Sequence, residues 1–138
     1  MEYSVKRGDV YFIERDGEET GSEQRAGRPA IVVSNNAQNL TSDVVQVVYL
    51  TTRLKSDLPT HVTIRSTGML STALCEQVTS IDISRLGDWK CQCTQSEMEA
   101  INQALLISLG LEIKQPTKSV VSWKDMYDNL LNKILERG

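Results

Sequence analysis

Residues 21–34 of this chain read GSEQRAGRPAIVVS, a polar loop that runs directly into an apolar strand. Glycine permits backbone conformations that other residues avoid, and Pro29 fixes φ where the strand begins. Arg28 therefore lies at the junction between a loop and a rigid element. A planar, permanently charged guanidinium in that position suits a forked grip on a phosphate. By residue type alone, a solvated arginine in a surface hairpin is the more common arrangement.

The rest of the chain has the composition of one globular domain. It contains 138 residues, of which 40% are hydrophobic and 24% charged, and a chain of this length can bury a core of its own. A single Phe predicts that this core is mainly aliphatic. The net charge of −3 argues against nonspecific attraction to nucleic acid. A local basic patch stays compatible with that charge, because basic residues occur in the first half: Arg7, Arg25, Arg28, Arg53 and Lys55.

No stretch of the sequence resembles a secretory signal or reaches the length of a membrane span. We therefore expect a cytoplasmic protein without a membrane partner. The cysteines Cys75, Cys91 and Cys93 suit a reducing compartment better than a disulfide framework. Together with His61 they could supply a zinc site, but their spacing matches no common zinc module. Ordinary buried or half-buried thiols are the better interpretation, and we expect no metal and no cofactor.

Short apolar segments separated by polar loops predict a series of β-strands. The predicted strands cover residues 9–13, 29–33, 43–50, 61–64, 73–79 and 81–86. Asn35-Asn36 is expected to form the turn after the second of them. Short strands followed by one helix suggest a strongly bent antiparallel sheet or partly open barrel, with the helix packed beside it.

The hydrophobic period changes to that of a helix near Thr94. Thr94 and Glu97 form a capping box, and apolar residues follow at helical spacing as far as Leu109. The spacing predicts a helix over about residues 95–111. We place the end of the main domain, residues 1–114, just after this helix.

Residues 115–138 are expected to form a separate helical extension. Gln115-Pro116-Thr117 interrupts the preceding pattern, and Ser122 with Asp125 can cap a second helix. The apolar side chains of that helix form one continuous stripe: Trp123, Met126, Tyr127, Leu130, Leu131, Ile134 and Leu135. Docking of this stripe on the chain's own domain is favoured over self-association or a partner surface.

Several motifs, taken in order, resemble the MazF/PemK family of toxins, the mRNA interferases of bacterial type II toxin–antitoxin systems. The resemblance runs from Val5 to about Ile113 and rests on these segments: KRGDVY at 6–11, GSEQ at 21–24, RPAIVVSN at 28–35, VYLTT at 48–52, LPTHV at 58–62 and CEQVTSID at 75–82. It implies a mainly β (α+β) fold, a small SH3-like antiparallel barrel with packed C-terminal helices of the MazF/CcdB type, assembled as a homodimer. The order of strands and helix read from the residues is compatible with that fold.

The resemblance also implies an activity, the metal-independent cleavage of single-stranded RNA at a short sequence. In this family the ribose 2′-OH attacks the adjacent phosphate, leaving a cyclic phosphate and a 5′-OH end. By position, Arg28 matches the catalytic arginine and Thr51 the catalytic threonine. A positioned guanidinium can stabilise negative charge that develops on the phosphate, and the Thr51 hydroxyl can donate to it or accept from it. Without the resemblance, Thr51 would be taken for an ordinary β-branched strand residue.

The group that moves the proton is left open by the sequence. An arginine, whose ordinary pKa is above about 12, is a poor general base. Either Glu23 or Glu76 could serve, and the spacing selects neither. His61, the one histidine of the chain, is interpreted as a residue that supports the fold at a strand start.

Single-stranded RNA is recognised through the polar edges of splayed bases. Donors and acceptors for these edges are predicted on the loop and on one strand: Ser22, Glu23, Gln24, Arg25, Glu76 and Gln77. Solvated hairpin polarity is the alternative for each of these side chains. The expected partners are the RNA substrate and a cognate antitoxin protein, with DNA reached only indirectly through the antitoxin.

Two other functions stay open. A noncatalytic toxin of the same fold could inhibit a protein such as DNA gyrase, and a degenerate copy could act as a decoy for an antitoxin. Arg28 and Thr51 at the family positions favour the nuclease. The loop carries Arg25-Ala26-Gly27 where the family usually has glycine earlier, which leaves its sequence preference open, and Cys75 replaces a usual aliphatic residue. The extension after residue 114 could cover a groove that the antitoxin would fill, or enlarge the dimer interface.

Overall fold

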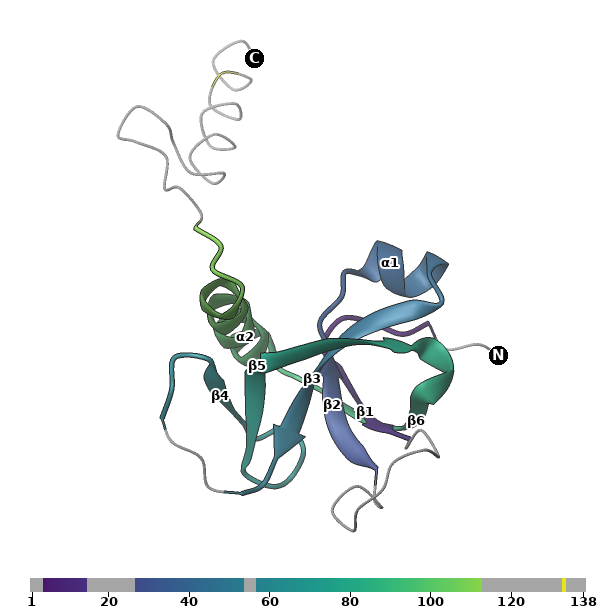
Figure 1. Ribbon diagram of the computed structural model, residues 1–138, viewed down its shortest axis with the longest axis horizontal. Coiled ribbons are helices and arrows are strands. Elements are labelled where there is room, and N and C mark those ends of the chain that lie inside the picture. The colour runs from purple at the N-terminus through teal and green to yellow at the C-terminus, as the bar shows by residue number, and fades with distance from the viewer. Residues whose placement is uncertain (1–3, 15–26, 54–56, 113–132, 134–138) are drawn as a thin grey trace.

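The computed structural model describes residues 4–14, 27–53 and 57–112, together with Lys133. These residues form a six-stranded sheet with a helix packed on one of its faces and shorter helices between the strands (Figure 1). The strands are β1 (Asp9–Ile13), β2 (Arg28–Val32), β3 (Val44–Thr51), β4 (His61–Ile64), β5 (Ser71–Asp82) and β6 (Leu86–Gln92). The helices are α1 (Asn36–Thr41), the short 3-10 helix η2 (Ile83–Arg85) and α2 (Gln95–Ser108).

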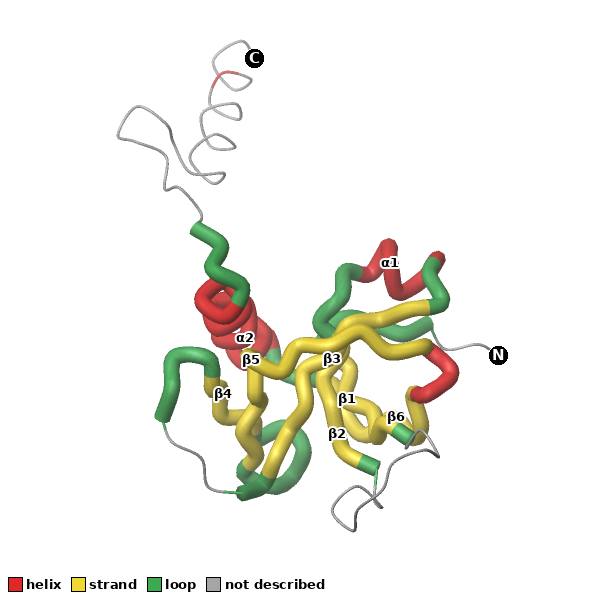
Figure 2. The backbone as a smooth tube through the Cα atoms, viewed as in Figure 1, coloured by secondary structure: helices red, strands yellow, loops and turns green. Residues whose placement is uncertain are grey.

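The strand order β4-β5-β3-β2-β1-β6 places β3 and β2 at the centre of the sheet and β4 and β6 at its edges. Every neighbouring pair in this order is antiparallel. Among the described residues β4 and β6 do not pair with each other, so the sheet is bent but not closed into a barrel (Figure 2). The predicted mainly β class is confirmed, with an open sheet in place of a closed barrel.

β5 bends midway along its length, so that it belongs to both halves of the sheet (Figure 2). Its first half pairs with all of β4, and its second half pairs with the first residues of β3. A shift in the pairing between Val48 and Leu50 of β3 marks the bend, because β5 contains extra residues there. An extra residue of this kind increases the local bend of a strand.

Alternation along the strands gives the sheet two apolar faces. One face packs against Ile101 and Ala104 of α2, and its buried residues are Val10, Ile31, Val48, Leu50, Val62, Ile64, Ala73, Cys75 and Cys93. The opposite face carries a second cluster, made of Tyr11, Ile13, Ala30, Val32, Val45, Val47 and Ile81. The predicted aliphatic core is therefore present, while Phe12 stays 37% exposed.

Two predictions about the elements were wrong. Asn35-Asn36 does not form a simple turn, because Asn35 caps α1 and its side chain accepts from the Gln38 backbone N–H at 2.8 Å. The same side-chain oxygen suits Asn to turns and to helix starts, so the residue type could not separate them. The strands predicted over residues 73–79 and 81–86 are instead the single strand β5, followed by η2.

The edge strand β6 was not predicted at all. Its sequence, LGDWKCQ, contains residues that are depleted in strands and lacks a clear alternation. It forms because β1 offers it a partner, with Gln92 opposite Asp9 and Trp89 opposite Tyr11. All of its residues are exposed or half-buried, as an edge strand with polar residues allows.

α2 begins at the predicted capping box. The Thr94 side chain accepts from the Glu97 backbone N–H at 3.1 Å, and the Glu97 carboxylate accepts from the Thr94 N–H at 2.9 Å. The helix ends at Ser108, short of the predicted residue 111, because Gly110 adopts a φ of 67°. The predicted helix from Ser122, and the domain boundary after residue 114, lie outside the described residues.

The Glu97 carboxylate also holds the loop that follows β4. It accepts from the backbone N–H groups of Arg65 at 2.7 Å and Ser66 at 3.3 Å, and from the Ser66 hydroxyl. Desolvation favours the neutral acid, but these hydrogen bonds and the one from Thr94 outweigh it and lower the pKa of Glu97 to about 2. One carboxylate therefore joins the start of α2 to the edge of the sheet.

Glu97→Gln should lower the free energy of unfolding by about 1–2 kcal/mol at pH 7, because it removes charge-assisted hydrogen bonds from this junction. The pKa of Glu97 falls from its ordinary 4.5 to about 2 on folding. Its contribution is therefore complete above pH 4.5 and is lost as the pH falls towards about 2. Urea unfolding of the two proteins across this range should show their stabilities converging.

Glu99→Gln is the matched control, because Glu99 is exposed on the same helix and receives one hydrogen bond within the described residues, from Gln95 Nε2 at 3.3 Å. It should change the free energy of unfolding by less than about 0.5 kcal/mol. Equal losses in both variants at every pH would contradict the assignment of Glu97 as the junction.

Candidate active site

The two predicted catalytic residues lie at neighbouring ends of the central strands. Arg28 begins β2 and Thr51 ends β3. These strands are antiparallel, with Ala30 opposite Tyr49. Continuing that register by two residues places Arg28 opposite Thr51, and paired strands lie about 4.8 Å apart. The fold therefore brings a guanidinium-bearing residue and a hydroxyl-bearing residue to the same face of the sheet.

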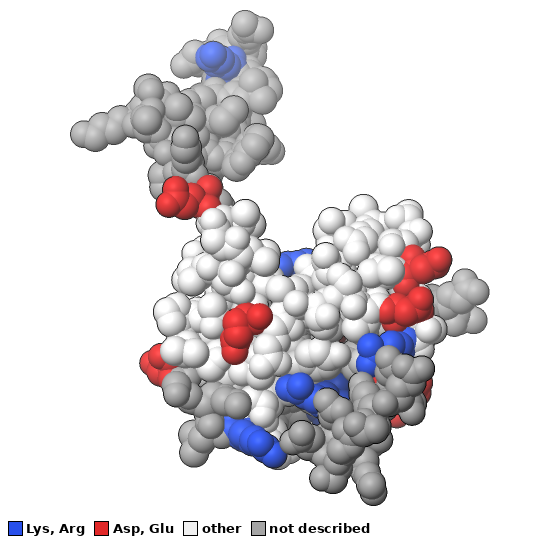
Figure 3. Space-filling view, in the orientation of Figure 1, with Lys and Arg blue, Asp and Glu red and all other residues white. Residues whose placement is uncertain are grey.

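The guanidinium of Arg28 rests on an aromatic ring. Its Cζ atom lies 4.7 Å from the centroid of the Tyr49 ring, within the range of a cation–π contact. Arg28 is exposed, and among the described residues no carboxylate forms an ion pair with it. Figure 3 shows basic side chains gathered over the lower half of one face, whereas acidic side chains lie mainly towards its margins. The charge of Arg28 is thus held in place without being neutralised by a described partner.

The Thr51 hydroxyl is also fixed in place. It is half-buried, and its Oγ1 accepts a hydrogen bond from the Arg53 backbone N–H at 3.2 Å. On the other side of β3, Thr51 pairs with Thr72 of β5. Because the oxygen accepts from the backbone, the hydroxyl proton is available to a ligand beside Arg28.

Glu76 and Gln77 lie on the bend of β5, and both side chains are exposed. The bend lies between the pairs Val48–Val78 and Leu50–Ala73, so these two residues come opposite the part of β3 that contains Tyr49. Bulged strands often carry side chains that face active sites. Since β5 and β2 pair with opposite edges of β3, these two predicted RNA-reading residues lie on the other side of β3 from Arg28.

The Glu76 carboxylate is held by neighbours on both oxygens. It accepts from the Thr60 hydroxyl at 3.0 Å, and its other oxygen lies 3.1 Å from His61 Nε2. Desolvation would raise the pKa of Glu76, but hydrogen bonds from its own backbone, from His61 and from Thr60 outweigh it and lower the pKa. A lowered pKa makes Glu76 a weak general base and a stable hydrogen-bond acceptor. The side chain of His61 is only 8% exposed, which agrees with a role in supporting the fold.

Four of the predicted RNA-reading residues, Ser22, Glu23, Gln24 and Arg25, lie outside the described residues. The described chain resumes at Gly27, where a Cβ atom would come within 2.8 Å of the Ile13 carbonyl oxygen. A side chain at this position would push the backbone beside Arg28 away from β1. Glycine at position 27 is therefore required by the close approach of these two strand ends.

The cysteines behave as core residues. Cys75 and Cys93 are buried on the face beneath α2, and burial raises the pKa of Cys75 to about 11 and that of Cys93 to about 12. Both are therefore neutral thiols at physiological pH. Within residues 4–14, 27–53 and 57–112 the His, Cys, Asp and Glu side chains form no group of three that could bind a metal.

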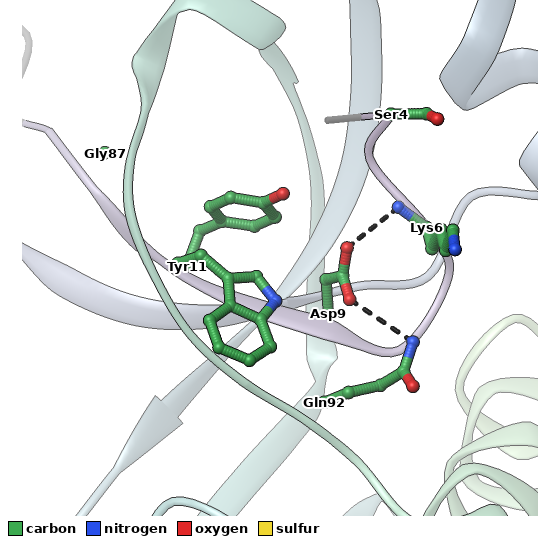
Figure 4. Close-up of a pocket in the computed structure, with 7 residues that line it drawn as sticks. Ser4, Lys6, Asp9, Tyr11, Gly87 and Gln92 are labelled. Carbon is green, nitrogen blue, oxygen red and sulfur yellow. Dashed lines mark hydrogen bonds between the residues drawn. The ribbon is translucent and has the colours of Figure 1, made fainter. Parts of the chain in front are cut away.

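A separate pocket of about 620 Å³ lies at the start of β1 (Figure 4). Its lining residues are Ser4, Lys6, Asp9, Tyr11, Gly87, Trp89 and Gln92, and neither Arg28 nor Thr51 is among them. The buried Asp9 carboxylate accepts from the Lys6 backbone N–H at 2.9 Å and from Gln92 Nε2 at 3.3 Å. Asp9 thus fastens the start of the chain to β6, which gives the KRGDVY motif a structural role.

Comparison with known proteins identifies the family. Residues 6–109 match the sequence model of the PemK-like, MazF-like toxins of type II toxin–antitoxin systems. The chain belongs to this family. An endoribonuclease MazF of Staphylococcus saprophyticus is 35% identical to this toxin over an alignment of 112 residues, which covers 78% of this chain and 92% of the relative.

Solved structures agree with this assignment. An endoribonuclease from a mycobacterial species has a TM-score of 0.67 and 29% identity to this toxin, covering 83% of this chain and 97% of that one. A mycobacterial endoribonuclease solved in complex with its cognate antitoxin gives a TM-score of 0.67 and 29% identity, with coverages of 81% and 99%. The predicted family and fold are confirmed, and so is the predicted enzyme class, an endoribonuclease.

The family match ends at residue 109 of this toxin, so the helical extension over residues 115–138 stays a prediction. Within the part of the chain that the structure describes, no helix combines the length and the apolar composition needed to cross a bilayer.

The sequence did not point to Tyr49 as part of the site. The available signal was its position on an alternating strand, two residues before Thr51, which places both side chains on one face. Its contact with Arg28 depends on the neighbouring strand and could not be read from β3 alone.

Thr60→Val should raise the pKa of Glu76, because it keeps the shape of the side chain but removes a hydroxyl that donates to the carboxylate. The carboxyl carbon resonance of Glu76, followed by NMR titration, measures this pKa. Thr63→Val makes the same change at an exposed position of β4 and should leave the pKa unchanged. An unaltered pKa in Thr60→Val would contradict the anchoring of Glu76.

Proposed function

We propose that this toxin cleaves single-stranded RNA, including mRNA, at a short sequence without a metal ion, by attack of the ribose 2′-OH on the adjacent phosphate. The products are a cyclic phosphate end and a 5′-OH end. The observation that carries the proposal is the register of β2 against β3, which pairs Ala30 with Tyr49 and, continued by two residues, brings Arg28 opposite Thr51. The endoribonuclease relatives support the substrate class.

The proposed chemistry is an intramolecular transesterification of the phosphodiester. The 2′-OH loses its proton as its oxygen bonds to phosphorus, the bond from phosphorus to the 5′-oxygen breaks, and the leaving 5′-oxygen takes up one proton, so the step has no net gain or loss of protons. Negative charge develops on the phosphate oxygens as the five-coordinate state forms. The guanidinium of Arg28 can stabilise this charge through forked hydrogen bonds, and the Thr51 hydroxyl can donate to the same group. In this proposal the protein side chain of Arg28 supplies the positive charge that stabilises the phosphate.

The general base is not assigned to Glu76, because its lowered pKa suits an acceptor better than a base. We propose instead that Glu76 and Gln77 read the polar edges of bases beside the cut. The loop residues Ser22, Glu23, Gln24 and Arg25 are proposed to read base edges as well. A carboxylate already fixed by Thr60 and His61 is preorganised for such a contact.

The proposed protein partners follow from the family. A cognate antitoxin is proposed because the family consists of toxins of toxin–antitoxin systems and a similar endoribonuclease was solved with its antitoxin. DNA is reached only through that antitoxin, and the proposed location is the cytoplasm, where both RNA and antitoxin occur.

A homodimer is proposed on the same family basis. Light scattering of the purified chain should give twice the mass of 15.4 kDa, and a monomer at all concentrations would contradict it.

The noncatalytic alternative, inhibition of a protein such as DNA gyrase, is not favoured. The relatives that cover most of this chain are named endoribonucleases. The decoy hypothesis would leave a copy without activity, and the assay below separates it from an active enzyme.

Purified toxin incubated with a long single-stranded RNA in EDTA should give fragments with 5′-OH ends. Arg28→Ala should lower the cleavage rate by at least about 100-fold, because it removes the charge that stabilises the transition state. Thr51→Val, which removes only the hydroxyl, should lower it by about 10-fold or more. Gel analysis with end-specific phosphorylation measures both the rate and the chemistry of the ends.

Arg65→Ala and Thr41→Val are the matched controls, because they make the same changes at exposed positions, after β4 and on α1. Both should cleave at the rate of the unaltered toxin. Intact RNA from folded toxin would refute the proposed function, and equal losses in Arg65→Ala would reduce the role of Arg28 to general surface charge.

A further inference from the structure

We infer that Tyr49 is a positioning residue for the proposed cleavage. Its ring holds the Arg28 guanidinium in the orientation in which it grips the scissile phosphate. This inference rests on the proposed function, since it requires Arg28 to contact the phosphate. It goes beyond that function in assigning a role to a residue outside the predicted site.

The pairing of the central strands makes the contact possible. Ala30 lies opposite Tyr49, so Arg28, two residues before Ala30, is the diagonal neighbour of Tyr49 on the same face. Diagonal neighbours across antiparallel strands lie about 7–8 Å apart, within the reach of long and aromatic side chains. The observed distance of 4.7 Å between the Arg28 Cζ and the ring centroid fits that geometry.

The ring is itself fixed by the core. Tyr49 is half-buried and packs against the second apolar cluster, which includes Ala30, Val32 and Val47. Arg28, in contrast, is exposed at the first position of its strand. A long exposed arginine has many rotamers, and contact with a fixed surface reduces their number before RNA binds.

An aromatic ring and a carboxylate hold an arginine in different ways. A carboxylate would occupy the N–H donors and neutralise the charge, and a phosphate would have to displace it. A ring face attracts the flat side of the guanidinium and leaves the N–H donors at its edge free for a phosphate. Since no carboxylate among the described residues pairs with Arg28, the Tyr49 ring is the described contact that orients this cation.

The position of Thr51 completes the arrangement. Tyr49 and Thr51 are alternate residues of β3 and share a face. The register of the Ala30–Tyr49 pair, continued by two residues, places Arg28 opposite Thr51 and diagonal to Tyr49. An arginine held over Tyr49 is therefore held beside the Thr51 hydroxyl. Without the ring the positive charge of Arg28 remains, but the guanidinium can adopt several orientations. This loss of orientation should weaken stabilisation of the transition state more than initial binding of the RNA.

The test measures kcat and KM for a short single-stranded RNA that carries a cut site mapped with the unaltered toxin, in EDTA. Tyr49→Phe should stay within about 2-fold of the unaltered kcat, because the ring face is kept. Tyr49→Leu should lower kcat by about 3- to 30-fold, with a smaller change in KM. Thermal unfolding confirms that each variant is folded, and Tyr49→Met serves as a second variant if Tyr49→Leu does not fold.

A spectroscopic measurement makes the test independent of activity. A proton over an aromatic ring face is shifted upfield, so the Arg28 Nε–H resonance should be upfield in the unaltered toxin and in Tyr49→Phe. It should return to the ordinary arginine region in Tyr49→Leu. Arg28→Lys, which lacks this group, assigns the resonance.

Phe12→Leu is the matched control, since Lys90 Nζ lies 5.0 Å from the Phe12 ring centroid in the same sheet. Phe12 alternates with Tyr11 and Ile13, so it lies on the opposite face from the second cluster. This variant should keep kcat and the Arg28 resonance unchanged.

The outcomes separate the two proposals. An unaltered toxin that leaves RNA intact would refute the proposed function. An active toxin in which Tyr49→Leu keeps full kcat, or in which Tyr49→Phe is as slow as Tyr49→Leu, would overturn the role of the ring while leaving the function standing. An Arg28 resonance that is ordinary in the unaltered toxin would also overturn it.

Discussion

The pairing of β2 with β3 is the constraint on which the rest of the site depends. It is maintained by burial on both faces, because Ile31 and Val48 pack towards α2 while Ala30 and Val47 pack in the opposite cluster. A slip of one residue would expose both sets and turn every side chain to the wrong face. The same slip would separate Arg28 from its neighbours on β3. Core packing and site geometry are therefore set by one register.

Among the described residues no carboxylate forms an ion pair with Arg28, although the whole chain has a net charge of −3. Arg28 is oriented by a ring instead of a described carboxylate. Glu76, across β3, is held by hydrogen bonds from Thr60 and His61. These contacts fix the position of its negatively charged carboxylate. Local placement of charge, and not its total, sets the electrostatic potential that a ligand would meet at this surface.

The motifs that mark the family divide into those that build the fold and those that face a ligand. Asp9 in the KRGDVY segment is buried and fastens the start of the chain to β6. His61 in LPTHV is largely buried behind Glu76. Arg28 is exposed, and Thr51 is half-buried with a hydroxyl fixed by the backbone. A shared motif therefore gives family membership, whereas exposure and contacts are needed to separate support from chemistry.

Local pattern by itself determined the strands with strong alternation, such as β3 and β4, and the start of α2 at Thr94, because period and capping act over a few residues. Family resemblance pointed to Arg28 and Thr51. Tertiary structure alone decided β6, whose polar sequence becomes a strand only beside β1, and the bend of β5 that presents Glu76 and Gln77. It also decided the Arg28–Tyr49 contact. These features arise between strands distant in sequence, and the pairing energy that creates them is absent from any single segment.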